Sequence, residues 1–129
     1  MAQETEGHLL DENIISEGVE SILNDSTKGY YYVACTEGKP IASLMITYEW
    51  SDWRNGNIWW IQSVYVDVDH RGKGVYRKMY EHIKDEISED PTIAGIRLYV
   101  FNENVNAQTV YKKLGMTGGN YQVFEWIKD

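Results

Sequence analysis

The run Val64-Tyr65-Val66-Asp67-Val68-Asp69-His70-Arg71-Gly72-Lys73-Gly74-Val75-Tyr76 joins an apolar, β-rich segment to a helix through a turn with two glycines and two cations. The N-terminus of a helix presents main-chain N–H groups that lack intrahelical acceptors, and such groups bind phosphate. Gly72 and Gly74 leave room for an anion at the backbone, while Arg71 and Lys73 add positive charge. The run is therefore read either as an anion-binding strand–turn–helix unit or as a solvated turn of the same composition.

Two common nucleotide-binding loops do not fit this run. A Walker A loop needs Ser or Thr after its Gly-Lys pair, but Lys73 is followed by Gly74. A Rossmann fingerprint would need a third glycine at position 77, which is Arg77. Nucleotide binding through either loop type is thus disfavoured.

Periodicity on both sides of the run predicts an α/β protein with the order α-β-β-β-α-β-α-β. Helical spacing predicts helices over residues 12–25, 75–89 and 105–114, with Asp11 as the first N-cap and Gly115 as the last stop. Alternation predicts strands over residues 30–36, 41–50, 58–67, 96–101 and 121–127. The strand over 58–67 is apolar on both sides, which indicates a central position. Strict alternation there places Ile61 and Tyr65 on one face and Gln62 and Val66 on the other.

Composition limits the class of protein. A chain of 129 residues is long enough for one domain, here residues 1–129 with residues 1–10 expected to be flexible. The net charge of −8 and the lack of a dense basic run argue against nucleic-acid and membrane partners. Cys35 lies in an apolar run and is expected to be a buried thiol rather than a nucleophile. A polar, acidic start predicts no secretory signal and a cytoplasmic protein.

The run resembles the acetyl-CoA signature of the GNAT superfamily, Arg/Gln-x-x-Gly-x-Gly/Ala. The segment from Arg71 to Tyr76 matches it except at the last position. A second GNAT element, Asn-x-x-Ala-x-x-x-Tyr-x-x-x-Gly-Phe, is similar to residues 104–116, with Met116 for the final Phe. The order and spacing of the two elements also match, and together they are more specific than either one alone.

The resemblance implies a mixed, mostly antiparallel sheet with a splayed parallel pair, flanked by helices. It further implies that acetyl-CoA binds in the splay and that a small primary amine attacks the thioester directly, without a metal or an acyl-enzyme. Tyr111 would protonate the leaving thiolate. Cofactor contacts would come from Val64, Tyr65, Val66, Arg71, Gly72, Lys73, Gly74, Val75, Tyr76, Asn104 and Ala107.

Several positions keep two interpretations. Tyr111 could serve packing alone, and Asn104 could cap its helix as well as bind the cofactor. An aromatic cluster could line an acceptor pocket by cation–π contact or serve ordinary packing; it comprises Tyr48, Trp50, Trp53, Trp59 and Trp60. Polyamine-type relatives have Glu where this chain has Gln62, so Glu49, Asp52 or a water chain are the candidates for the base.

The chain also resembles a GNAT domain without its usual first strand and helix. This favours, as an alternative function, a non-catalytic acyl-CoA-binding or interaction module. Without that first strand, the strand over residues 30–36 lies at a sheet edge with unpaired main-chain groups. This predicts either a homodimer that buries the edge or residues 1–10 folding back to cover it.

Overall fold

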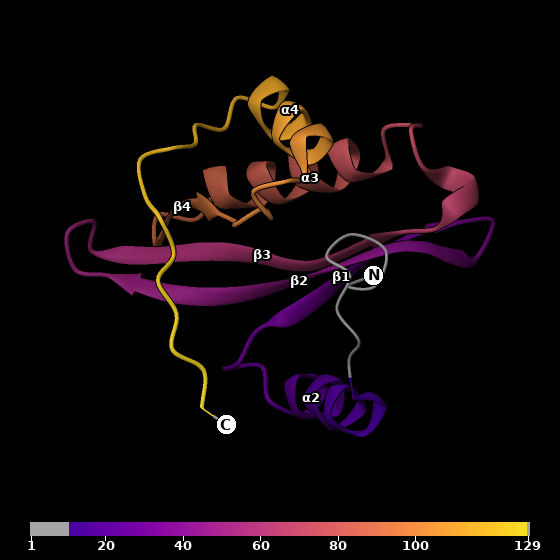
Figure 1. Cartoon of the computed structure of the whole chain (residues 1–129), viewed down its shortest axis with the longest axis horizontal. Coiled ribbons are helices and arrows are strands. Elements are labelled where there is room, and N and C mark those ends of the chain that lie inside the picture. Colours follow the sequence, from indigo (N-terminus) through magenta and orange to yellow (C-terminus); the bar gives the residue numbers. More distant parts are fainter. Residues whose placement is uncertain (1–10, 129) are drawn as a thin grey trace. The chain divides into compact units, whose positions relative to one another are not determined.

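The computed structural model describes residues 11–128, and the chain divides into two compact units, residues 1–99 and 100–129. The described part of the first unit contains α2 (Glu12–Asn24), β1 (Tyr30–Thr36), β2 (Lys39–Ser51), β3 (Gly56–Val66), the 3-10 turn η1 (Val68–His70), α3 (Val75–Ser88) and β4 (Ile93–Arg97) (Figure 1). The second unit contains α4 (Val105–Lys113). None of the helices within residues 11–128 combines the length and the apolar composition that a bilayer crossing requires.

The four strands form one sheet in the order β1-β2-β3-β4. The β1–β2 and β2–β3 pairs are antiparallel, and β3 and β4 are parallel. The mixed, mostly antiparallel sheet is therefore confirmed, and β3 occupies the predicted internal position.

A bulge in β3 changes which side chains share a face. Ser43 pairs with Tyr65 while Met45 pairs with Gln62, so β3 carries one residue more than β2 in this stretch. Ser63 there has φ +50°. An extra residue reverses the alternation, so Tyr65 shares a face with Gln62. The strict alternation expected over residues 58–67 is wrong beyond Gln62, because periodicity alone does not reveal a bulge.

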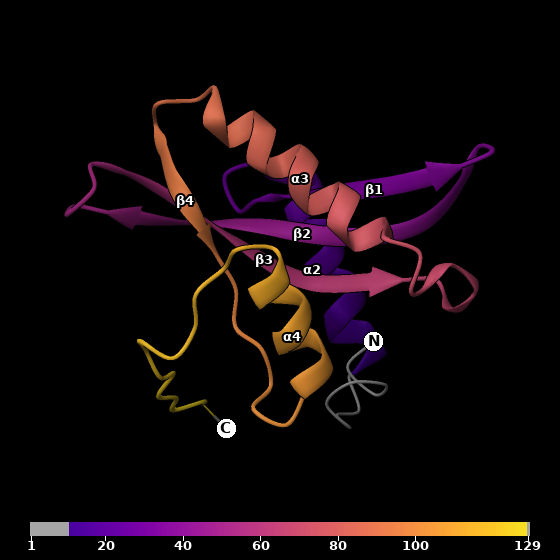
Figure 2. The same cartoon turned by 90° about the horizontal axis from the view of Figure 1, so that it is seen from above.

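Helices α2 and α3 lie on opposite faces of the sheet (Figures 1 and 2). Tyr32, which pairs with Leu44, donates from its hydroxyl to Oε2 of Glu86 on α3 at 2.6 Å. The face of Leu44 and Ile46 is thus covered by α3, and these two side chains are fully buried together with Ile83 of that helix. We call this the α3 face and the opposite one the α2 face.

Helix α2 begins after the predicted cap, since Asp11 Oδ1 accepts the N–H groups of Asn13 and Ile14 at 2.9 and 3.2 Å. Its expected apolar stripe is only partly buried. Ile22 is buried, whereas Ile14 and Leu23 are 70% and 68% exposed. Helical spacing shows that these residues share a face, but how much of that face is covered depends on tertiary packing.

Three other expectations need correction. Residues 121–127 form no strand. Alternating apolar and polar residues give a segment one apolar face, but a strand also needs a neighbouring strand with which to form hydrogen bonds. Strand β4 spans Ile93–Arg97 rather than residues 96–101. Cys35 is exposed instead of buried, since it lies near the end of an edge strand. The expectation of flexibility for residues 1–10 concerns a segment outside the described residues.

Candidate functional site

The parallel strands β3 and β4 part at one residue pair. Their register ends where Trp60 lies beside Arg97, while β3 continues to Val66. Strand β4 ends at this pair, whereas β3 continues beyond it, and Figure 2 shows the different directions of the two strands. Within the described chain, the main chain of β3 from Ile61 to Val66 thus has a strand partner in β2 but none in β4. We call the position where their pairing ends the fork. Beyond it lies the edge of β3, including Val64, where the resemblance implies that the cofactor binds.

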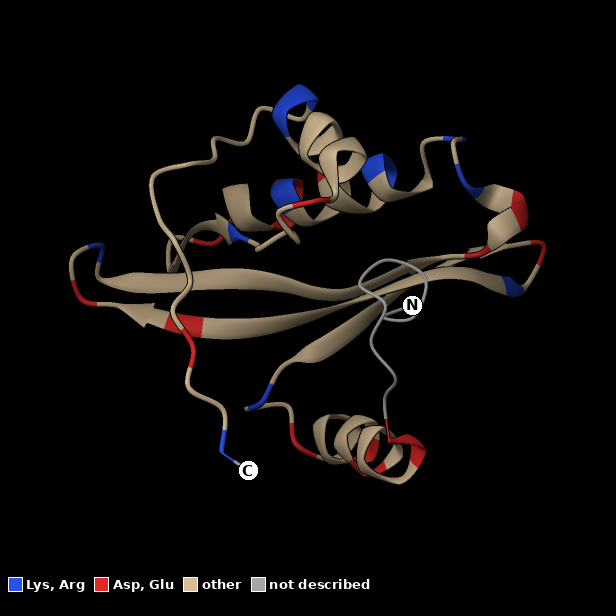
Figure 3. Ribbon diagram, viewed as in Figure 1, with Lys and Arg blue, Asp and Glu red and all other residues tan. Residues whose placement is uncertain are grey.

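The glycine turn follows directly after this edge. Gly72 and Gly74 have φ +74° and +78°, a left-handed conformation that favours glycine. A Cβ added at either position would meet nothing within 4 Å, so the space above the turn is open. Gly74 is the N-cap of α3 and supplies no side chain, which leaves the first N–H groups of the helix without a side-chain cap. Figure 3 shows Lys and Arg gathered along the turn and the start of α3. These features suit a phosphate group.

Arg71 fastens the turn to the strand. Its Nε donates to the main-chain carbonyl of Val66 at 2.8 Å, and its guanidinium carbon lies 5.6 Å from the centre of the Tyr65 ring. Through this bond Arg71 positions the turn in addition to supplying charge. Tyr76, the departure from the GNAT signature, lies with its ring 6.4 Å from that of buried Tyr80 and nearly parallel to it.

A polar cluster lies on the α2 face at the fork. Glu49 of β2 accepts the indole N–H of Trp60 at 2.7 Å and contacts Nη1 of Arg97 at 3.2 Å. On the same face, the Gln62 side-chain amide donates to Oγ1 of Thr47 at 2.5 Å. One ion pair therefore reaches from β2 to β4 across β3.

The candidate bases are placed differently. Glu49 lies at the fork, where the exposed edge of β3 begins. Asp52 lies in the β2–β3 loop, and its Oδ1 accepts the main-chain N–H of Trp53 at 2.9 Å. Gln62 lies near the fork but carries an amide, which cannot take a proton at neutral pH.

The second GNAT-like element lies in the second unit. Asn104 Oδ1 accepts the main-chain N–H of Ala107 at 3.1 Å, so the capping role expected for Asn104 is confirmed. Tyr111 lies on α4 and is half-buried. Burial raises the pKa of the Tyr111 phenol, which keeps it protonated at neutral pH. A protonated phenol is the form that a general acid needs.

A family model described as "Acetyltransferase (GNAT) family" matches residues 4–116, and so extends over both units. The chain belongs to the GNAT acetyltransferase family. A possible acetyltransferase from Clostridium difficile 630 has the same fold, with a TM-score of 0.92 and 45% identity over 99% of this chain and 84% of that one.

Curated relatives in the GNAT family carry acceptor names. A probable spermine N(1)-acetyltransferase from Bacillus subtilis subsp. natto is 28% identical over 67% of this chain and 56% of its own length. A thialysine N-epsilon-acetyltransferase from Bos taurus is 31% identical over 60% of this chain and 48% of its own. The chain spans about half the length of these curated relatives.

Arg97 was not predicted as a site residue of this GNAT chain. Its signal in the sequence is a single cation among the apolar residues of a short strand, Ile93-Ala94-Gly95-Ile96-Arg97. Such an arginine could equally point to solvent at a sheet edge. Only the strand register, which sets Arg97 beside Trp60 and within reach of Glu49, makes it part of the cluster.

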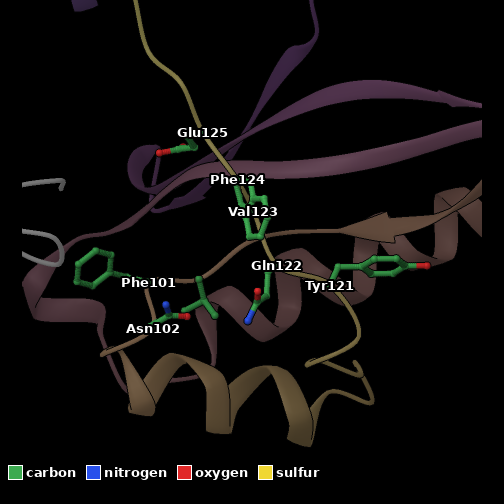
Figure 4. A pocket seen from close by; sticks show the side chains of 8 residues that line it. Phe101, Asn102, Tyr121, Gln122, Val123, Phe124 and Glu125 are labelled. Atoms are coloured by element: carbon green, nitrogen blue, oxygen red, sulfur yellow. The ribbon is translucent and has the colours of Figure 1, made fainter.

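The second unit also contains an open hollow (Figure 4). It is lined by Val100, Phe101, Asn102, Tyr121, Gln122, Val123, Phe124 and Glu125. The residues expected to form the last strand thus border this hollow instead, and Phe124 is 90% exposed. None of the predicted catalytic or cofactor-binding residues lines it.

Proposed function

We propose that the chain is an N-acetyltransferase that moves the acetyl group of acetyl-CoA to the primary amine of a small molecule. The observation that carries this proposal is the continuity along β3. Within the described residues, the edge of β3 from the fork to Val66 has no partner in β4, and it leads through the 3-10 turn η1 into an open glycine turn at a helix N-terminus without a side-chain cap. The edge offers main-chain hydrogen bonds to an extended amide-containing arm, and the turn offers N–H groups to a pyrophosphate. Coenzyme A combines these two features in one molecule.

Specific residues would hold the donor in this scheme. Main-chain groups at Val64 and Val66 would pair with the pantetheine arm, and the turn from Arg71 to Tyr76 would bind the pyrophosphate. Asn104 and Ala107 would add contacts to the arm. Acetyl-CoA would supply a thioester whose carbonyl carbon accepts attack by a neutral amine.

The proton transfers are assigned to two residues. Glu49 is the base candidate at the fork and would take a proton from the acceptor ammonium, directly or through water. Tyr111, kept protonated by burial, would donate a proton to the departing thiolate. The C–N bond would form as the C–S bond breaks, and the nitrogen would release its remaining extra proton to solvent or back to the Tyr111 phenolate, so that an N-acetyl amine and free coenzyme A result.

The acceptor class follows from the relatives' names, which specify spermine and thialysine and thus small amines. We also place the reaction in the cytoplasm as part of this proposal.

An acetyl-CoA turnover screen over a broad amine panel, run beside a calorimetric titration with CoA, tests the proposal. Thiol release with at least one amine supports it. Tight CoA binding without turnover across the panel would favour the non-catalytic acyl-CoA-binding module. Absence of both binding and turnover in a folded protein would contradict both functions.

A further inference from the structure

The charged pair at the fork is accessible to a ligand. The side chain of Arg97 is 29% exposed and that of Glu49 is 41% exposed. The rings of Trp60 and Tyr99 lie next to the pair, with their centres 5.3 Å apart at an interplanar angle of 56°. Two opposite charges with an aromatic wall beside them therefore lie where the free edge of β3 begins.

The positions of β2 and β3 next to the pair on the α2 face carry uncharged side chains. Along the α2 face, the neighbouring positions of β2 and β3 carry Met45, Thr47, Trp60 and Gln62. Glu49 and Arg97 neutralise each other in this setting. A ligand with only positive charge would pair with Glu49 but would set a second cation beside Arg97, and like charges at close range repel strongly where water is displaced. A ligand with one charge of each sign would keep both residues paired.

Resting on the proposed acetyl transfer, we propose that the acceptor carries a carboxylate close to its amine, as amino acids do. Arg97 binds this carboxylate, and Glu49 holds the ammonium that is to be acetylated. A guanidinium has five N–H donors in a planar fork that fits carboxylates, so it is able to hold two carboxylates at once. The pair is then a specificity element that selects zwitterionic amines over polyamines.

Matched acceptors test the carboxylate directly. Ornithine and putrescine, lysine and cadaverine, and phenylalanine and phenethylamine differ within each pair only in the carboxylate. We expect kcat/KM for the better amino acid to exceed that of its decarboxylated partner by about tenfold to a hundredfold, the effect of one hydrogen-bonded charge contact. Arg97→Gln should abolish this preference, so that kcat/KM for the amino acid no longer exceeds that of its decarboxylated partner. Arg97→Lys, which keeps the charge, should retain part of it.

Lys84→Gln is the control, because it removes one positive charge from an exposed position of α3 outside the cluster. It should leave the preference unchanged. Circular dichroism melts of each variant show whether it is folded. If Arg97→Gln does not fold, the carboxylate preference is measured with Arg97→Lys instead.

Two outcomes overturn the inference. One is a wild type that acetylates the decarboxylated amines as well as the amino acids or better. The other is a preference that survives in folded Arg97→Gln. A wild type that acetylates no amine contradicts the proposed function instead. In that case, calorimetric titration of the CoA-saturated protein with each matched pair still decides whether the site prefers a carboxylate.

Discussion

The side chain of Arg71 ties the glycine turn to the end of β3, because its Nε donates to the main-chain carbonyl of Val66 at 2.8 Å. The stacking of its guanidinium over Tyr65 holds the same side chain from a second direction. The start of the anion-binding turn is thereby held at the end of the strand edge.

Arg71→Lys separates this positioning role from the charge. Lysine keeps the positive charge but lacks the planar guanidinium that both donates to Val66 and stacks on Tyr65. We expect the substitution to weaken CoA binding by about tenfold, the range for one hydrogen bond and one cation–π contact. Isothermal titration with CoA measures the effect. Wild-type affinity in the lysine variant would show that only the charge matters.

Gly74→Val should weaken CoA binding by about tenfold to a hundredfold, because a branched side chain would fill the space where the phosphates bind. The substitution also strains a left-handed residue, so a control must carry the same strain. Gly38, in the β1–β2 turn, has φ +79° against +78° for Gly74 and equally open surroundings. Gly38→Val should therefore lower the melting temperature to a similar extent but leave CoA affinity intact. Equal CoA affinity in the two folded variants would rule out the turn as the anchor.

Tyr111→Phe removes the hydroxyl that is the proposed proton donor. We expect acetyl-CoA affinity to change less than threefold and kcat to fall by about a hundredfold, the range for the loss of a positioned general acid. Steady-state kinetics at saturating acetyl-CoA measures the loss. If the variant keeps wild-type turnover under conditions where chemistry limits the rate, Tyr111 is a packing residue.

The fold was predictable to the extent that it depends on local signals. Asp11 caps α2 as its side chain and position suggest, and the glycine turn leads into α3 at Val75. The predictions that were wrong concern features that depend on pairing with a neighbouring strand. The bulge at Ser63 depends on pairing with β2, and residues 121–127 alternate without a ladder.

The candidate site also has a part that could be predicted from local sequence and a part that could not. The turn from Arg71 to Gly74 could be found because its chemistry is contiguous in the sequence. The cluster of Glu49, Trp60 and Arg97 comes from three strands, and its ion pair spans 48 positions. Glu49 was singled out as a base, but its engagement by Trp60 and Arg97 follows only from the register of the sheet.

Alkaline pH should destabilise the fold through the partly buried Tyr32. Burial raises the pKa of Tyr32 well above its usual value near 10, and the hydrogen bond with Glu86 raises it further. The unfolded chain therefore ionises first. The stabilising contribution is complete below pH about 10 and declines as pH rises through the folded-state pKa.

Denaturant unfolding at several pH values between 7 and 11 measures this loss. Tyr32→Phe removes the ionisable group, so the free energy of unfolding of that variant should decline less steeply above pH about 10. The variant also loses the bond to Glu86, which lowers its stability at pH 7 by about 1–3 kcal/mol. Parallel pH profiles of variant and wild type would show that Tyr32 does not contribute.

Strand β1 is an edge of the sheet within the described residues, with β2 on one side only. No charged residue lies between Tyr30 and Cys35 to discourage pairing, and Val33 is 55% exposed. An apolar, uncharged edge of this kind invites another strand. We therefore predict a homodimer that buries β1 of both copies. The alternative, cover by residues 1–10, concerns a segment outside the described residues.

Light scattering over a range of protein concentrations tests the dimer. Val33→Lys places a charge on the edge and should shift the protein to the monomer, because pairing would bring two ammonium groups close together. Val123→Lys is the matched control, since Val123 is 58% exposed but belongs to no strand. It should leave the mass unchanged. A wild type that stays monomeric at every concentration, and whose residues 1–10 give the narrow NMR signals of an unattached segment, would contradict both the dimer and the cover. Equal dissociation by the two lysine variants would instead place the interface away from β1.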